Sequence, residues 1–220
     1  MENAEVNVLV TAGPTREFLD PVRFIGNRST GKMGYALARA AIQHGHQVVL
    51  ISGPTSLDAP TDARLICVES AQQMLEAVQN NIEWCDVLIM AAAVCDWRPT
   101  RRSIHKLKKR DMPASLRLEP TPDILKSIRN RKEHRLYIGF AAETENLLDE
   151  ARRKLVEKEL DLIVANDVSR PDSGFETDTN IATLVSPPDI VSELPLLTKQ
   201  ALAEEILEWA ETAVSTRSKA

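Results

Sequence analysis

Short runs of aliphatic and β-branched residues alternate along this chain with segments whose apolar residues recur at helical spacing. We expect strands at residues 6–11, 47–52, 64–68, 86–90, 136–140 and 162–165. We expect helices at residues 32–45, 71–82, 122–129 and 145–159. The strand segments are apolar on both faces, which is typical of a parallel sheet covered by helices on each side. The alternation therefore predicts a doubly wound α/β fold, Rossmann-like in three layers, with a mostly parallel sheet.

The C-terminal region departs from this alternation. Residues 180–185 have the pattern of one more strand, and residues 199–214 that of an amphipathic helix with Leu202 and Ile206 on its apolar face. A chain of 220 residues with 43% hydrophobic residues suits one sizeable core. Because no internal repeat or low-complexity linker is present, we expect a single domain that takes in residues 1–220.

Charge and hydropathy exclude several classes of function. Lys and Arg total 27 against 32 Asp and Glu, so no overall attraction to nucleic acid is expected and any anion site must be built locally. No apolar run approaches the ~18 residues that span a bilayer, and the polar N-terminus leads into a strand without a signal peptide. Cys67, Cys85 and Cys95 form no Cys-x-x-Cys pair, which favours buried, reduced thiols. We expect a cytoplasmic protein without membrane partners.

Residues 26–32, Gly-Asn-Arg-Ser-Thr-Gly-Lys, match the phosphate-cradling pattern G-x-x-x-x-G-K. The next residue is Met33 rather than the Ser or Thr that binds Mg²⁺ in such loops, and the segment does not follow the first strand directly. A true P-loop is therefore disfavoured. Two interpretations stay open: small residues that open a helix whose N-terminus binds an anion, or an ordinary helix capped by Ser29 or Thr30.

Doubly wound sheets bind ligands beyond the carboxyl ends of their strands. Residues 11–29, 91–110 and 141–144 follow predicted strands and would converge at that edge. Residues 98–113 contain most of the basic side chains there, with few apolar anchors and strong self-repulsion, so we expect a mobile basic flap. Composition alone favours the alternative that the same stretch is a solvated basic loop, because runs of charge usually face water.

Several longer motifs occur in one order along the chain. They are TAGPTRE at residues 11–17, DPVRFIGNRSTGKMG at 20–34, AAAVCDWR at 91–98, KLKK at 106–109, TPDI at 121–124, GFAAET at 139–144, ARRK at 151–154 and ANDV at 165–168. Together they resemble the phosphopantothenate–cysteine ligase family of coenzyme A biosynthesis, over about residues 6–210. KLKK resembles the K-x-K-K motif of the CTP-dependent bacterial type. In many bacteria this domain follows a flavin-dependent decarboxylase, which is absent from this sequence, so the resemblance implies the ligase activity alone.

The resemblance implies a two-step reaction. CTP, with Mg²⁺, cytidylylates the carboxylate of 4′-phosphopantothenate and releases pyrophosphate. The amine of L-cysteine then attacks the acyl-cytidylate, and CMP leaves as 4′-phosphopantothenoyl-L-cysteine forms. Both steps develop anionic charge, so hydrogen-bond donors and cations should crowd the site. The sequence contains no readable carboxylate cage for a metal, which is consistent with Mg²⁺ held mainly by phosphates and water.

Two residues have catalytic roles implied by the resemblance. Lys106, ten residues after Asp96, is implied to support formation of the acyl-cytidylate, with its ammonium offsetting charge at the triphosphate. Asn27 is implied to support conversion to the amide, by holding substrate amide groups and donating to the carbonyl oxygen as it becomes tetrahedral. Without the resemblance, Asn27 reads equally well as a turn residue.

The remaining implied roles concern binding. Asp96 with Ala92 and Ala93 is implied to bind the pantothenate moiety, whereas a helix-capping Asp is the plain alternative. Arg23 matches an arginine that reaches the substrate phosphate from a neighbouring subunit, which implies a homodimer. The implied CTP-binding residues are Ala91, Ala92, Asp96, Lys106, Thr121, Pro122, Asp123, Ile124, Phe140, Lys154 and Lys158.

Lys154 and Lys158 lie four residues apart on one predicted helix. Two cations in this arrangement repel each other by ~0.2–0.5 kcal/mol, so an anion should offset them. The resemblance supplies the phosphates of CTP. The alternative is Glu150, one turn before Lys154.

Two other classes of function compete with a ligase. An NAD-dependent dehydrogenase is disfavoured because G-x-G-x-x-G is absent after the first strand. A non-catalytic Rossmann-like nucleotide-binding module would not need both Asn27 and Lys106. The four histidines, at positions 44, 46, 105 and 134, show no metal-ligand spacing, so we assign them no role and predict no metal site.

Overall fold

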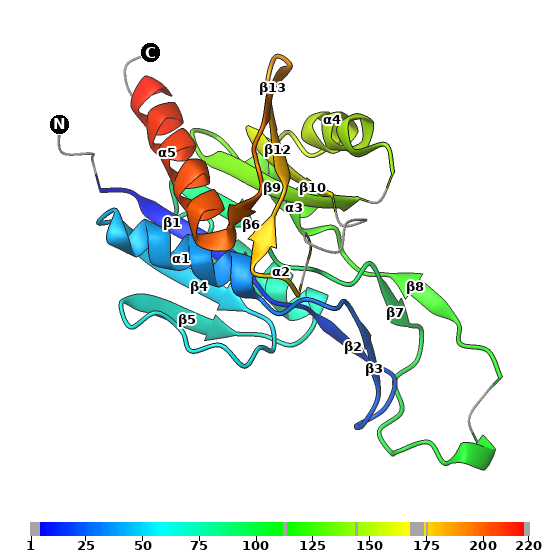
Figure 1. Cartoon of the computed structure of the whole chain (residues 1–220). Helices are drawn as coiled ribbons and strands as arrows, with labels where there is room; N and C mark the ends of the chain where they lie inside the picture. Colours follow the sequence, from blue (N-terminus) through cyan, green and yellow to red (C-terminus); the bar gives the residue numbers. More distant parts are fainter. Residues whose placement is uncertain (1–4, 112–113, 144, 168–173, 175, 218–220) are drawn as a thin grey trace.

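The computed structural model describes residues 5–111, 114–143, 145–167, 174 and 176–217. Within them an eight-stranded sheet separates two layers of helices (Figure 1). Across the sheet the strands follow the order β13 (Ile190–Glu193), β12 (Ala182–Ser186), β10 (Leu162–Asp167), β9 (Leu136–Glu143), β6 (Val87–Met90), β1 (Asn7–Ala12), β4 (Gln47–Ser52) and β5 (Ala63–Cys67). Every strand predicted from the alternation is present.

The sheet is mostly parallel, as predicted. Strands β10, β9, β6, β1, β4 and β5 run in one direction, while β12 and β13 add an antiparallel edge. Val8 of β1 lies between Val48 of β4 and Val87 of β6. The chain builds outward from β1 on one side and then crosses to β6 on the other, which creates a switch point between β1 and β6. Crevices at such points are where doubly wound sheets bind ligands.

Helices cover both faces of the sheet (Figure 1). One face holds α1 (Lys32–Gln43) and α5 (Lys199–Arg217), and the other holds α2 (Ala71–Asn81), α3 (Ile124–Ile128) and α4 (Leu147–Glu157). The predicted helices are confirmed, with a 3₁₀ turn (Arg129–Arg131) completing the third. Among the described helices none is both long and apolar enough to cross a bilayer.

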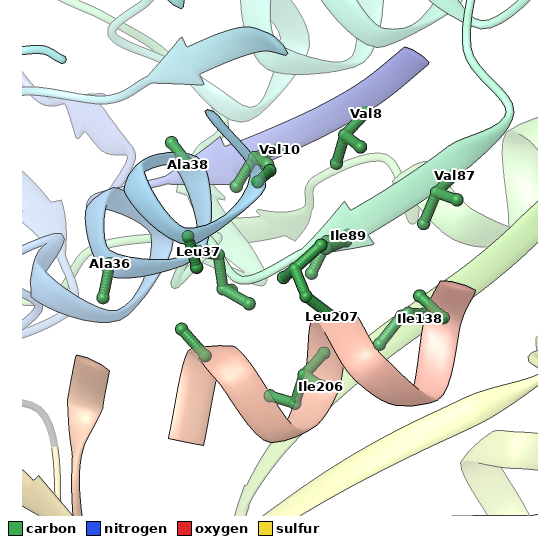
Figure 2. Packing of buried hydrophobic residues seen from close by; sticks show 14 of the residues in the cluster. Val8, Val10, Ala36, Leu37, Ala38, Val87, Ile89, Ile138, Ile206 and Leu207 are labelled. Atoms are coloured by element: carbon green, nitrogen blue, oxygen red, sulfur yellow. The ribbon is translucent and has the colours of Figure 1, made fainter. Parts of the chain in front are cut away.

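The core consists of two apolar layers, one on each face of the sheet. Val8 and Val10 of β1 belong to the layer beneath α1 and α5, whereas Leu9 belongs to the opposite layer, because successive side chains of a strand point to opposite faces. Figure 2 shows the first layer, in which Leu37 of α1 and Ile206 of α5 meet the strands. Burial on both faces explains the near-continuous apolar runs in the sequence.

Gly34 sets how closely α1 approaches β1. A Cβ at this position would lie 2.5 Å from the Cβ of Ala12 and 2.9 Å from the carbonyl oxygen of Thr11. No side chain fits at that separation, so a glycine is required for the close contact. The first turn of α1 is therefore held directly against the carboxyl end of β1.

Two short hairpins project from the sheet and were not predicted. They are β2 (Arg16–Phe18) with β3 (Phe24–Gly26), and β7 (Trp97–Pro99) with β8 (Leu118–Pro120). Together with the chain between β7 and β8 they extend away from the main body (Figure 1), and we call residues 16–26 and 97–120 the arm. The predicted flap is the outer part of the arm, and its residues 112 and 113 lie outside the described residues.

Two further predictions need correction. The expected strand at residues 180–185 is two strands: β11 (Thr179–Asn180) pairs with β14 (Leu197–Thr198), while Ala182–Ser186 joins the main sheet as β12. Cys67 is exposed at the end of the edge strand β5, although Cys85 and Cys95 are buried as expected. Edge strands have only one neighbour, so the pattern of a buried strand overstates their burial.

Candidate active site

A cavity of about 640 Å³ opens beyond the carboxyl ends of β6, β9 and β10. It lies beside the switch point and includes the first turn of α1. All but two of the predicted site residues line it: Asn27, Ala91, Ala92, Ala93, Asp96, Thr121, Pro122, Asp123, Ile124, Phe140, Lys154 and Lys158. The exceptions are Arg23 and Lys106, which line a second cavity on the arm. Segments that are far apart in the sequence therefore share one site.

Asn27 is tied to the end of β6. Its amide Nδ2 donates to the carbonyl oxygens of Ala93 at 3.2 Å and Val94 at 2.9 Å. Both amide hydrogens are thus directed at backbone oxygens, and Oδ1 is the remaining polar atom of the side chain. This arrangement differs from the expected donation to a tetrahedral oxygen, because in this conformation Asn27 offers a substrate an acceptor.

The first turn of α1 faces the cavity without a side-chain cap. Gly31 is the N-cap residue, with φ of +81°, and among the described residues no side-chain cap hydrogen bond is present at this end of the helix. The alternative in which Ser29 or Thr30 caps the helix is therefore wrong; the hydroxyl of Ser29 instead accepts from the N–H of Gly31 at 3.3 Å. Free N–H groups and the positive end of the helix dipole make this turn a suitable anion site.

The segment of three alanines leaves β6 as a wall of the cavity rather than as a continuation of the strand. The N–H of Ala92 donates to Thr11 Oγ1 at 3.2 Å, and the N–H of Cys95 donates to Thr15 Oγ1 at 2.8 Å. Both threonines are fully buried. Thr11 in β1 and Thr15 in the loop after it thus fix the position of the wall. The small alanine side chains leave room for a ligand to approach the backbone.

Asp96 is exposed at the rim of the cavity, and the residue that caps a helix here is Asp123. The side chain of Asp123 accepts from the N–H of Lys126 at 3.2 Å, at the start of α3. Thr121 joins the two segments, because its hydroxyl donates to the carbonyl oxygen of Cys95 at 2.6 Å and its N–H donates to that of Asp96 at 2.9 Å. The capping alternative for Asp96 is therefore wrong.

Lys154 and Lys158 both point toward this site from α4 and its end. Lys154 pairs with Glu143 at 2.5 Å and Lys158 pairs with Asp123 at 3.2 Å. Glu150 pairs with Arg153 at 2.8 Å and interacts with Lys154 only through its charge, so the direct partner of Lys154 is Glu143 rather than Glu150. Both lysine side chains remain about a quarter exposed and line the cavity, where a polyanion could contact them.

Two more lysines line the cavity and were missed from the sequence. Lys32 pairs with Asp178 at 2.6 Å. Lys199 is buried, and its Nζ donates to the carbonyl oxygens of Gly174 at 2.9 Å and of Thr177. Burial, and then the nearby charge of Lys32, lowers the pKa of Lys199 to about 8. Lys32 ends the G-x-x-x-x-G-K segment, but no local pattern distinguishes Lys199, because only the fold brings α5 to the start of α1.

Asn180 is a further lining residue that the sequence did not indicate. Its side chain is 4% exposed, and its Oδ1 has no hydrogen-bond partner among the described residues. A buried, unpaired amide oxygen costs roughly 1–3 kcal/mol, so a polar group of a ligand is a suitable partner for it.

The arm holds Arg23 and Lys106 close together around one buried carboxylate. Asp20 accepts from Arg23 Nη2 at 2.5 Å and from the N–H of Leu107 at 3.1 Å. Arg23 Nη2 also donates to the carbonyl oxygen of Leu107 at 2.7 Å. The hydrogen bond from Arg23 outweighs burial and holds the pKa of Asp20 far below its usual range. Arg23 and the segment that contains Lys106 thus form one hydrogen-bonded unit, separate from the main cavity.

Comparison with known proteins identifies what this architecture resembles. The Coenzyme A biosynthesis bifunctional protein CoaBC of Bacillus subtilis (strain 168) is 50% identical over 203 residues, which cover 92% of this chain and 50% of that protein. The chain thus spans about half the length of the curated relatives it matches. A crystal structure of the C-terminal domain of a protein of the same name superposes with a TM-score of 0.84 at 44% identity, over 98% of this chain and 100% of that one.

A more distant structure shares the fold. It is a mutant of Cab2 in complex with phosphopantothenate-cysteine, which superposes with a TM-score of 0.78 at 18% identity, over 98% of this chain and 89% of that one. The family model described as the DNA/pantothenate metabolism flavoprotein C-terminal domain matches residues 3–213. With the match extending over nearly all of its length, the chain belongs to the family of that C-terminal domain.

Proposed function

We propose that this chain is a ligase of coenzyme A biosynthesis that joins 4′-phosphopantothenate to L-cysteine at the expense of CTP. The products are 4′-phosphopantothenoyl-L-cysteine, CMP and pyrophosphate, and the reaction takes place in the cytoplasm. The observation that carries the proposal is the single cavity that collects Asn27, the alanine wall and the lysines of α4. The relatives named above, and the complex of Cab2 with phosphopantothenate-cysteine, support the choice of substrates.

In the first step the carboxylate of 4′-phosphopantothenate attacks the α-phosphorus of CTP, and the bond to pyrophosphate breaks. Lys154 and Lys158 would bind the phosphates, and exchange of their carboxylate partners for phosphate would retain a charge-assisted contact. The open first turn of α1 adds N–H donors on the opposite side. Phe140 and the segment 121–124 would hold the base and ribose.

In the second step the cysteine amine attacks the acyl carbon, loses a proton, and CMP leaves. Asn27 would position this step from its place beside Ala93 and Val94, with Oδ1 accepting from an N–H of the attacking amine or of the pantothenate amide. Asp96, at the rim, would accept from a pantothenate hydroxyl or amide group. The alanine wall admits the substrate close to the backbone.

Lys106 and Arg23 require a different account, because both lie on the arm. Since they share hydrogen bonds through Asp20 and Leu107, they would reach a cavity together. We propose a homodimer in which the arm of one subunit supplies this unit to the cavity of the other. Exposed apolar side chains on the arm support this proposal, because a partner subunit would cover them. They are Val22, Phe24, Trp97, Ile104, Leu116 and Leu118.

Mg²⁺ would enter with CTP. Asp96 and Asp123 are carboxylates that line the cavity, and Asp123 is already engaged with Lys158 and α3. This donor set fits an ion held mainly by phosphate oxygens and water, with at most one protein carboxylate. The ion would neutralise charge on the triphosphate, while the lysines orient it.

The direct test is product formation by the purified chain. With CTP, Mg²⁺ and 4′-phosphopantothenate, pyrophosphate should appear before cysteine is added, and the amide should appear only after cysteine is added. Replacement of CTP by ATP should reduce the rate. A protein that binds CTP but releases no pyrophosphate would instead be the non-catalytic nucleotide-binding module, and the ligase proposal would be wrong.

A further inference from the structure

A cluster of two histidines and two glutamates lies at the opposite end of α1 from the cavity. The cluster, which we call the His–Glu cluster, consists of His44, His46, Glu204 and Glu211. The 12-residue helix α1 is about 18 Å long, so the cluster is remote from the substrate site. None of its members has a place in the proposed reaction.

The turn after α1 brings the two histidines together. Gly45 has φ of +84°, and its N–H donates to the carbonyl oxygen of Ile42 at 2.9 Å, which ends the helix. The reversal carries His46 back beside His44, with ring centroids 6.3 Å apart. The sequence His-Gly-His alone shows neither the reversal nor what lies opposite.

Helix α5 supplies the two carboxylates. Glu204 and Glu211 are seven residues apart, so they lie two turns apart on one helix face. His44 bonds both of them, through Nδ1 to Glu211 Oε1 and through Nε2 to Glu204 Oε2, each at 2.7 Å. His46 Nε2 bonds the same Oε1 of Glu211 at 2.9 Å. Two imidazoles therefore converge on one carboxylate oxygen.

The cluster is largely shielded from solvent. The side chain of His46 is 1% exposed and that of Glu211 is 12% exposed. The Nε2 of His46 faces Glu211, while its Nδ1 is buried and has no hydrogen-bond partner among the described residues. The carboxylate oxygens of Glu204 and Glu211 and the imidazole nitrogens of the two histidines therefore face one another in a shielded place.

We propose that the His–Glu cluster binds one divalent transition-metal ion of the zinc type, with His44 Nδ1, His46 Nε2 and Glu211 as ligands, water as the fourth, and Glu204 holding the other ring nitrogen of His44. One ligand atom from each of the first three residues lies within 4.8 Å of the others. Zinc bonds of about 2.0–2.2 Å set tetrahedral ligand atoms ~3.3 Å apart, so small side-chain shifts suffice. Two imidazoles and a carboxylate are ligands that zinc prefers.

Binding of the ion would replace hydrogen bonds by coordination bonds. The ligating nitrogen of each histidine must be unprotonated, so a proton on that nitrogen moves to the other ring nitrogen or leaves to solvent. The ion would then join the end of α1 and the start of β4 to α5, which covers the sheet beside α1. The expected consequence is a more stable packing of α5.

The test is titration of the metal-free chain with Zn²⁺ alone, by calorimetry and by thermal unfolding. The background variant Cys67→Ser removes the exposed thiol, which is a competing zinc ligand. In that background we expect one saturable zinc per chain and a higher unfolding temperature with zinc than with chelator. His46→Gln should weaken binding by more than the 10–100-fold that loss of an outer-shell partner costs.

His134→Gln is the matched control, because it makes the same exchange at an exposed histidine outside the cluster and should leave zinc binding unchanged. If the buried His46→Gln variant fails to fold, His44→Gln tests the same site at a side chain that is 22% exposed. Absence of a saturable zinc, or equal affinity in the cluster variants and the control, would overturn the proposal. These readouts are independent of ligase activity.

Discussion

The cavity wall and the arm both contain predicted site residues, but they are held in place differently. Ala92 and Ala93 follow a buried central strand and are fixed by hydrogen bonds to β1 and its loop. The arm is instead held by two hairpins whose strands have only three residues each and by the hydrogen bonds of Asp20. Contacts of arginines with aromatic rings add to these, such as Arg102 over the ring of Phe18 at 4.9 Å. Its outer side chains are mostly exposed.

Because of this difference, we expect the wall to determine substrate binding and the placement of the arm to determine whether the site is complete. The wall can hold a substrate in the isolated chain, because the sheet fixes its geometry. The arm presents Lys106 to solvent in the isolated chain, so its contribution depends on where the arm is placed. A comparison of variants in the two regions should therefore separate defects of chemistry from defects of architecture.

The largest expected effect is at the arm. Lys106→Gln should reduce pyrophosphate release from CTP and 4′-phosphopantothenate by about 10²–10³-fold, because the cation that offsets charge in the first step is lost. The far-UV circular dichroism should stay unchanged, since the side chain is exposed. Arg101→Gln, an exposed change on the same arm, is the control. An unaltered rate of pyrophosphate release in Lys106→Gln would remove the arm from the reaction.

The matching change in the wall is Asn27→Asp. It sets a carboxylate against the carbonyl oxygens of Ala93 and Val94, so the hydrogen bonds that place the side chain are lost. We expect the acyl-cytidylate to accumulate, with amide formation slowed by about 10²-fold, while one equivalent of pyrophosphate is still released. Quenched-flow analysis with labelled CTP measures both species. Equal loss of the two half-reactions would contradict a role confined to the second.

A mixing experiment tests whether the arm acts on a neighbouring subunit. If Lys106 serves the cavity of the partner, a mixed dimer of the Asn27→Asp and Lys106→Gln variants has one cavity with both native residues. Random exchange then restores up to about one quarter of the wild-type rate, since half of the dimers are mixed and each has one intact site. Each variant incubated alone is the control. No recovery after proven exchange would mean that Lys106 acts within its own chain.

A change behind the wall should alter stability. Gly34→Ala places a Cβ 2.5 Å from that of Ala12, so α1 must move away from β1. We expect the free energy of unfolding to fall by about 1–3 kcal/mol, even though alanine favours helix formation. Urea denaturation measures it, with Arg39→Ala on the exposed side of α1 as the control. Unchanged or increased stability would show that α1 is free to shift.

The smallest expected global effect is from Asp20→Asn. Loss of the carboxylate weakens the contacts with Arg23 and Leu107, so tryptic cleavage within the arm should become several-fold faster while the unfolding midpoint of the core stays near wild type. Because the pKa of Asp20 is lower in the folded state, its ionised carboxylate stabilises the arm at pH values above the unfolded-state pKa of about 3.9. This stabilisation of the arm is lost as the pH falls below that value. In wild type, acid should therefore accelerate cleavage of the arm by a protease that is active at low pH. Asp62→Asn, at an exposed position, should change neither measurement.

Local patterns in the sequence were sufficient for much of the framework. The strands and helices of the parallel region follow from the periodicity of buried side chains, which depends only on residues close together in the chain. Most of the motif residues line one cavity beyond the strand ends, where a ligand was expected, and ligand binding there stays a prediction. The hairpins of the arm were not predicted, because strands of three residues have too few side chains to show an alternation of apolar and polar residues.

Contacts between distant segments were decided only by the tertiary structure. The sequence does not indicate that Asn27 bonds the end of β6, that Lys199 lies beside Lys32, or that His46 meets Glu211. Each of these depends on which helix covers which strand and on side-chain positions fixed by packing across the sheet. The periodicity of apolar residues indicates whether a side chain is buried or exposed. The hydrogen-bond partner of a polar side chain depends instead on how the strands and helices are arranged in space.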